Sequence, residues 1–106
     1  NGLSNLRGTV GMARTAAPDT ATSQFYFNVQ DNLGFDYISA ANPGYAVFGR
    51  ITQGLDVMDT IFAVTTGTAL LLGDDGQPLT GPTGQTLPLS SVPLQDVVLR
   101  TARQTR

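Results

Sequence analysis

The chain has 106 residues, 41% of them hydrophobic, so it fits one globular domain with a modest core, which excludes a disordered protein. Its formal net charge is −2 and its six basic residues form no basic stripe, which argues against nucleic acid as a partner. Because the chain has no His and no Cys, it offers no Ser-His-Asp or Cys-His unit, no thiol redox site and no standard zinc site, and we expect no cofactor and no metal.

Membrane and targeting signals are not expected either. The longest apolar run, Ala69–Leu72, is too short to cross a bilayer. No basic segment followed by an apolar stretch opens the chain, so no signal peptide is expected. Any reaction that these residues carry out must therefore proceed without a nucleophile and without a proton relay.

The first third of the chain predicts two strands around a loop. Thr9–Met12, reaching Ala13, reads as the first strand, and Gly11 within it indicates close backbone packing. Arg14–Ser23 is predicted to be a loop, because Ala-Pro-Asp-Thr is typical of a turn. Gln24–Val29 is predicted to be the second strand.

The second strand carries the most informative pattern in the sequence. Alternation places Gln24 and Tyr26 on one face, and Phe25 and Phe27 on the other, which we expect to be core. An amide beside an aromatic ring is typical of an apolar binding site with one polar orienting group. The alternative is an aromatic strand buried on both sides with Gln24 at its rim. Composition alone leaves both interpretations open.

Turns and a third strand follow. A turn is predicted at 31–34, with Phe35–Tyr37 as a short apolar plug beneath it. A loop around Asn42-Pro43-Gly44 then leads into a strand over Tyr45–Ile51, which alternates well enough for a half-buried strand.

One helix is predicted, over Leu55–Val64. Its apolar residues recur at three- and four-residue spacing and build one stripe, made of Leu55, Met58, Ile61 and Phe62. Asp56 in the first turn suits the helix dipole. We expect this helix to cover the core and not to bind a partner.

The rest of the chain is rich in Gly, Pro and Thr. Thr65–Pro93 is an excursion, in which leucines flank Asp74–Gln77 as in a hairpin. Val97–Thr101 alternates as a last strand. With no internal repeat and no linker, the sum is a mainly β, closed or nearly closed structure with one helix.

The motifs GTVGMART, TSQFYFNV and GYAVFGRITQGLDVMDTI, in that order, resemble the second half of the cyclophilin family of peptidyl-prolyl isomerases. The likeness covers about Gly2 to Val64 closely, and Val97–Thr101 resembles the closing strand. It implies the C-terminal part of a mainly β, antiparallel β-barrel with one capping helix. Residues 1–106 would form a single domain that lacks its N-terminal portion. The segment 65–93 departs from the shorter members of the family. The ART and NVQDN variants look more bacterial than animal, which implies the bacterial cytoplasm or periplasm.

The resemblance also implies a peptide groove on the outside of the barrel. There Gln24 would hydrogen-bond the substrate backbone, and Tyr26, where Phe is commoner, would floor the proline pocket. Phe35 lies near the apolar rim, although we interpret it more as a plug, and Arg14 is expected to contribute its backbone while its side chain is solvated. The implied substrate-binding set is Ala13, Arg14, Thr15, Gln24, Tyr26, Phe35 and Tyr45.

The family's catalytic Arg belongs to a segment upstream of anything in this sequence. Arg7, Arg14 and Arg50 lie in other contexts, so no catalytic residue is assigned in this chain. We therefore expect this chain alone to be nearly inactive, and a separate chain or an upstream segment to complete the barrel.

Two functions stay open. The first is isomerisation of Xaa-Pro bonds in polypeptides during protein folding, which needs no acid, base or nucleophile. The second is a non-catalytic module that binds proline peptides or serves assembly and keeps the groove. A lesser possibility is that 65–93 docks a partner.

Overall fold

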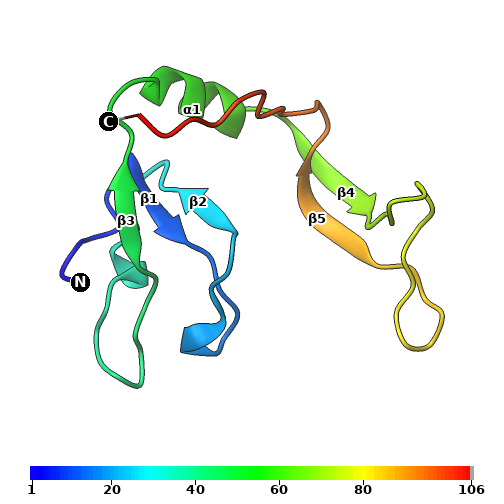
Figure 1. The fold of residues 1–106 in the computed structure, drawn as a ribbon, viewed down its shortest axis with the longest axis horizontal. Helices are drawn as coiled ribbons and strands as arrows, with labels where there is room; N and C mark the ends of the chain where they lie inside the picture. The colour runs from blue at the N-terminus through cyan, green and yellow to red at the C-terminus, as the bar shows by residue number, and fades with distance from the viewer. Residues whose placement is uncertain (106) are drawn as a thin grey trace. The chain divides into compact units, whose positions relative to one another are not determined.

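In the computed structural model, which describes residues 1–105, the chain forms two compact units that divide after Phe62. Each unit has its own small antiparallel sheet (Figure 1). The first unit holds three strands and the α-helix, and the second holds two strands. The predicted class, mainly antiparallel β with one helix, is confirmed.

The sheet of the first unit consists of β1 (Thr9–Met12), β2 (Phe25–Phe27) and β3 (Val47–Arg50), in the order β2-β1-β3. Both pairings are antiparallel, and Gly11 on β1 lies opposite Tyr26 on β2. Because β1 is central, β2 and β3 each keep one edge without a strand partner among residues 1–105.

The strands predicted at 9–13, 24–29 and 45–51 are confirmed, although each is shorter than expected. Backbone pairing nevertheless continues beyond the end of β1. The Ala13 N–H donates to the Gln24 carbonyl at 2.9 Å, and the Met12 N–H donates to the Ala46 carbonyl at 2.9 Å. These bonds join the residues just outside each strand to the same sheet.

Helix α1 spans Leu55–Phe62, two residues less than predicted. The chain leaves the helix within Ala63–Thr65 because it enters β4 at Thr66. Met58 is buried at 6% exposure, and it and Val47 at 3% form the buried apolar core. Met58 is the one buried residue of the helix, so the helix covers the sheet only in part. Two short 3₁₀ turns, Pro18–Thr20 and Leu33–Phe35, lie in the loops.

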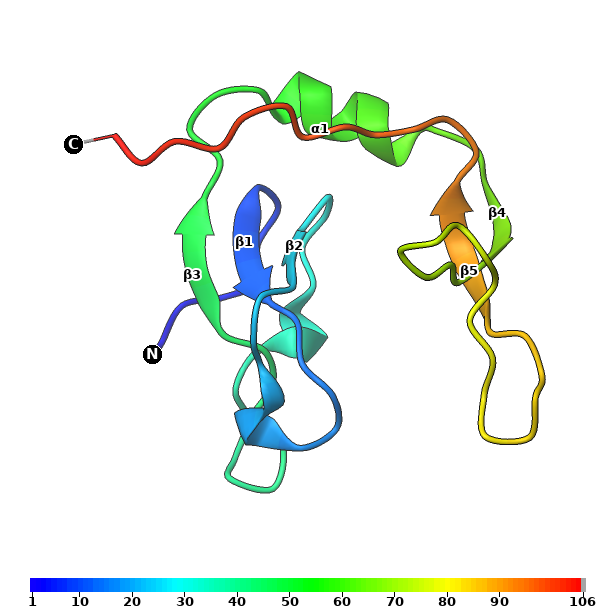
Figure 2. The ribbon, with the colours of Figure 1, turned by 45° about the vertical axis from the view of Figure 1, so that its right-hand side comes forward.

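The second unit is a β-hairpin of β4 (Thr66–Leu70) and β5 (Pro88–Pro93) (Figure 2). Within its long connection, the hairpin predicted around 74–77 is present. The Leu79 N–H donates to the Leu71 carbonyl at 2.8 Å, and the Gly73 N–H to the Gln77 carbonyl at 2.8 Å. Gly76 takes a φ of +76° at the tip, which glycine adopts without strain. The excursion is therefore ordered β structure.

The last predicted strand, over Val97–Thr101, is wrong. These residues belong to no strand, and the side chains of Val98 and Leu99 are 70% and 75% exposed. Alternation alone does not make a strand, which needs a neighbour to take up its backbone hydrogen bonds. This segment has no such neighbour among residues 1–105.

Within the described residues, no helix combines the length and the hydrophobicity that crossing a bilayer requires.

Candidate functional site

The candidate site is built around the ring of Tyr26, which lies across Gly11 of the neighbouring strand. A Cβ atom at Gly11 would collide with the Tyr26 ring and hydroxyl, so the ring depends on the bare backbone beneath it. The close packing predicted from Gly11 is thereby explained.

Two further aromatic rings contact Tyr26. Phe35, in the second 3₁₀ turn, and Tyr45, just before β3, both meet the Tyr26 ring edge to face at 6.1 Å between centroids. Phe35 and Tyr45 also contact each other at 5.2 Å. Such edge-to-face pairs add stabilisation beyond the area they bury. Three segments far apart in the sequence are thus joined in one aromatic cluster, defined here as Tyr26, Phe35 and Tyr45.

The aromatic cluster rests on a buried asparagine. The Tyr26 hydroxyl donates to Oδ1 of Asn5 at 2.7 Å, and Asn5 is fully buried at 0% exposure. Burial is the largest cause that raises the pKa of Tyr26 above its usual value of 10.0, and Tyr45 and Asp36 add to it. The phenol therefore stays neutral and remains a donor.

Asn5 also forms hydrogen bonds with three other residues around the aromatic cluster. Its backbone N–H and its Nδ2 donate to Oδ1 of Asp36 at 2.7 and 2.9 Å, and Nδ2 donates to the Tyr45 carbonyl at 3.2 Å. Nδ2 of the buried Asn28 donates to Asn5 Oδ1 at 3.1 Å. The hydrogen bonds from Asn5, first that of the backbone and then that of the side chain, lower the pKa of Asp36.

Sequence reasoning missed both Asn5 and Asn28. Asn5 lies in a stretch predicted to be irregular, and Asn28 follows the aromatic strand where a polar residue normally marks its end. Nothing in the neighbouring residues separates a buried asparagine from a solvated one. Asn5, Asn28 and Asn32 are connected by side-chain hydrogen bonds in the folded chain, but their distance in sequence gives no signal of this.

The side chain of Arg14 is half-buried and bonded to backbone carbonyls, so it is less solvated than expected. Its Nε and Nη2 donate to the Gly44 carbonyl at 3.1 and 2.6 Å, and its Nη1 donates to the carbonyls of Thr15 and Ala16 at 2.8 and 3.2 Å. The guanidinium carbon lies 4.7 Å from the centroid of the Tyr45 ring, in cation–π geometry. Gly44, the acceptor on the second loop, has a φ of +63°, and a Cβ there would collide with the backbone of Phe35 and Asp36, so this loop packs against the 35–36 segment.

The side chain of Arg14 is hydrogen-bonded, whereas its backbone groups are not. Neither its N–H nor its C=O has a hydrogen-bond partner among residues 1–105. By contrast, the Ala13 N–H is bound to Gln24, and the Thr15 N–H to Oγ1 of Thr20 at 3.0 Å. An extended peptide could therefore add its main chain at Arg14, as in strand addition.

Gln24 lies on the same side of the sheet as Tyr26. It pairs with Ala13 in continuation of the β1–β2 ladder and precedes Tyr26 by two residues, so both side chains leave the sheet in the same direction. Gln24 is exposed, and its side-chain amide has no hydrogen-bond partner in the described part of the chain. The amide is therefore available to a ligand.

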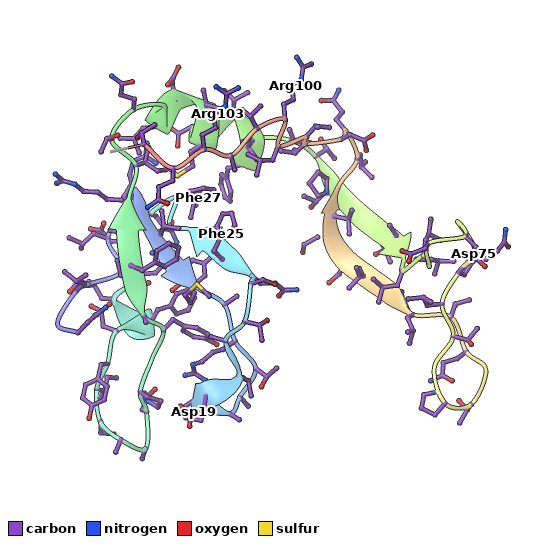
Figure 3. The ribbon with its side chains drawn as sticks, in the orientation of Figure 1. Asp19, Phe25, Phe27, Asp75, Arg100 and Arg103 are labelled. Carbon is purple, nitrogen blue, oxygen red and sulfur yellow. The ribbon has the colours of Figure 1, made fainter. Side chains whose placement is uncertain are left out.

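The other face of β2 is apolar and open. Phe25 and Phe27 stand next to each other at 5.7 Å between centroids, and they remain 51% and 47% exposed (Figure 3). A hollow of about 680 Å³ on this face is lined by residues of the sheet and of α1, chiefly Val10, Phe27, Val29, Val57, Met58 and Ile61. This is the face predicted to be core, and among residues 1–105 it is only half covered.

A smaller hollow of about 180 Å³ lies beside Arg14 and Tyr45. Its remaining walls come from the loops and from the irregular start of the chain, including Leu3, Pro18, Tyr37 and Pro43. Tyr26 lines neither hollow. The structure thus brings Arg14, Tyr26, Phe35 and Tyr45 into contact, with the free Arg14 backbone and Gln24 on the strands next to them.

Comparison with known proteins relates the chain to one family. Residues 1–83 match the family model of the cyclophilin type peptidyl-prolyl cis-trans isomerase/CLD. A peptidyl-prolyl cis-trans isomerase of Acinetobacter baylyi is 56% identical over 68 residues, which is 64% of this chain and 36% of the relative. Peptidyl-prolyl cis-trans isomerase B of Escherichia coli is 52% identical over 69 residues, or 63% of this chain and 42% of the relative.

Peptidyl-prolyl cis-trans isomerase A of Dickeya dadantii is 53% identical over 66 residues, 62% of this chain and 34% of that protein. The chain thus spans well under half the length of these bacterial relatives. The match to the family model extends past the first unit into the hairpin of the second. The resemblance carried by the SQFYF strand, the VFG strand and the following helix is confirmed, and the chain belongs to the cyclophilin-type peptidyl-prolyl cis-trans isomerase family.

Proposed function

We propose that the protein containing this chain is a peptidyl-prolyl cis-trans isomerase that assists protein folding by turning Xaa-Pro bonds in other polypeptides. One observation carries this proposal: the Tyr26 ring lies across β1, whose end carries the free N–H and C=O of Arg14. A peptide chain with a proline ring needs both features at once.

The chemistry of the reaction fits these residues. Rotation about a peptide bond faces a barrier of about 18–20 kcal/mol because of amide resonance, and exchange at Xaa-Pro bonds takes tens to hundreds of seconds without help. Catalysis requires tighter binding of the twisted bond than of either planar isomer. Tyr26 would hold the ring, while Gln24 and the Arg14 backbone would hold the peptide on one side of the twisting bond.

A donor to the prolyl nitrogen is the part that we do not assign to residues 1–105. The Arg7 guanidinium is bound by both nitrogens to the carboxylate of Asp59 at 2.8 Å, and the Arg14 guanidinium is engaged with three carbonyls. Arg7 and Arg14 are therefore occupied, and Arg50 lines the hollow on the Phe27 face, away from the Tyr26 face, which together support a donor arginine outside this chain. The chain alone would then be nearly inactive, because losing one well-placed electrostatic group costs about 10²–10³ in rate.

The open apolar face supports a further part of the proposal. We infer that the remainder of one cyclophilin-like domain, from an upstream segment or a separate chain, covers Phe25 and Phe27 and pairs with a free edge of β2 or β3. Half-exposed rings and unpaired edges both favour such a partner. In this arrangement residues 65–93 remain a β-hairpin within or beside that domain.

The test is a coupled isomerisation assay with an Xaa-Pro peptide, run on residues 1–106 and on the complete protein. We expect the complete protein to accelerate exchange and residues 1–106 to lose about 10²–10³ of that acceleration. A complete protein that binds the peptide but leaves the exchange rate unchanged would refute the isomerase function in favour of a non-catalytic binding module.

A further inference from the structure

Every recorded hydrogen bond of the Arg14 side chain ends on a backbone carbonyl. On one side the acceptors are Thr15 and Ala16, which follow β1, and on the other side the acceptor is Gly44, which precedes β3. No carboxylate pairs with this guanidinium among the described residues. The side chain therefore ties two loops together at the same end of the sheet.

The two loops joined in this way carry the candidate site. The first contains the Arg14 backbone, whose N–H and C=O are free, and the second leads into Tyr45, whose ring lies under the guanidinium at 4.7 Å. Tyr45 in turn contacts Tyr26 and Phe35. A single side chain thus connects the strand end proposed to bind the peptide with the aromatic cluster proposed to hold the proline.

Only arginine has the donors for this geometry. The planar guanidinium sends hydrogen bonds in several fixed directions, whereas the ammonium of lysine is a point charge on a flexible stem. A lysine at position 14 could keep a positive charge over the Tyr45 ring but could not serve both loops in the same way. A lysine at position 14 therefore separates the effect of the positive charge from the effect of the several directed N–H donors of the guanidinium, which we call the donor fork.

We propose that Arg14 is a positioning residue, whose side chain holds the 14–16 and 44–45 loops so that the Arg14 backbone faces the bound peptide in register with Tyr26. This role rests on the proposed function. Because the peptide main chain is held in the planar and twisted states alike, a loosened clamp should raise KM and leave kcat nearly unchanged.

The test compares three variants of the complete protein. Arg14→Gln removes both the charge and the fork, and Arg14→Lys keeps only the charge. Arg100→Gln is the matched control, because Arg100 is exposed and has no hydrogen bond among residues 1–105. The readouts are kcat and KM for an Xaa-Pro peptide, together with amide hydrogen exchange at Thr15 and Tyr45, whose N–H groups are bonded to Thr20 and to Phe35.

We expect both Arg14 variants to raise KM by about tenfold, the effect of losing roughly one net hydrogen bond of constraint. The amides of Thr15 and Tyr45 should exchange faster relative to those of β1, because only the loops are released. Arg100→Gln should change neither readout.

Three results would overturn the proposal: an unchanged KM in Arg14→Gln, a lysine variant equal to the parent in both readouts, or exchange in β1 that speeds up as much as in the loops. The last would mean that Arg14 serves only overall stability. If the parent binds the peptide without turnover, the isomerase function fails, and Kd replaces KM in the same comparison. If the parent neither binds nor turns over the peptide, both proposals fail.

Discussion

The hydroxyl of Tyr26 donates a 2.7 Å hydrogen bond to the side-chain oxygen of Asn5, a residue with no exposed surface. The same asparagine holds Asp36, the Tyr45 carbonyl and Asn28. The ring of Tyr26 is thus fixed in the aromatic cluster by a polar contact at its hydroxyl end.

Replacing Asn5 by Ala should destabilise the protein by about 3 kcal/mol, because the buried Asn28 and three partly buried groups lose their hydrogen bonds at once. Urea unfolding of the complete protein measures this change. Asn42→Ala is the control, because the Asn42 side chain is exposed and has no hydrogen bond among residues 1–105. Equal unfolding midpoints for the two variants would show that the Asn5 network contributes nothing.

Replacing Tyr26 by Phe should cost only about 1 kcal/mol, since Asn5 Oδ1 still accepts a hydrogen bond from Asn28 and the ring keeps its contacts. The isomerisation rate should stay within about threefold of the parent, because the proposed role belongs to the ring and not to the hydroxyl. Tyr26→Leu is the contrasting variant, in which ring and activity are lost together. Loss of activity in Tyr26→Phe would assign chemistry to the hydroxyl and contradict this view.

Gly11→Ala should destabilise the sheet by about 1–3 kcal/mol, because the new Cβ meets the ring of Tyr26, which is held at its far end by Asn5. Gly49→Ala is the matched control on β3, where a Cβ would lie 3.9 Å from the Cβ of Val10 in ordinary contact. Thermal unfolding of the two variants measures the difference. A midpoint for Gly11→Ala at or above that of Gly49→Ala would show that the ring can move aside.

The lowered pKa of Asp36 predicts an acid-sensitive contribution to stability. Its hydrogen bonds from Asn5 hold the pKa below the usual value of 3.8, so the folded state binds this proton more weakly than the unfolded state does. The contribution is therefore complete above the usual value and is lost as the pH falls through the lowered one. Unfolding measured between neutral pH and strong acid should show a smaller acid loss in Asp36→Asn. An identical pH profile in that variant would refute the coupling.

Much of the sheet could be predicted because its strands obey simple rules. The period of two separated the Tyr26 face from the Phe25 face, and Gly11 signalled the close approach of another chain segment. Three strands, the helix and the 74–77 turn lie where local pattern placed them. Such features depend on residues adjacent in sequence.

The errors concern contacts between distant segments. Arg14 was expected to be solvated because nothing near it in sequence shows that the Gly44 carbonyl arrives beside it. Val97–Thr101 was expected to be a strand because alternation does not show whether a partner strand is present. The role of Asn5 was missed for the same reason, since its partners lie between 21 and 40 residues further along the chain.

The first six residues contain no helix and no strand, yet they carry Asn5 and also Asn1, whose side chain donates to the Val47 carbonyl at 2.7 Å. A local opening confined to this short segment would therefore withdraw the support of Tyr26 while the three strands were still paired. The aromatic cluster is tied to the least regular part of the unit, so its arrangement can be lost before the sheet unfolds.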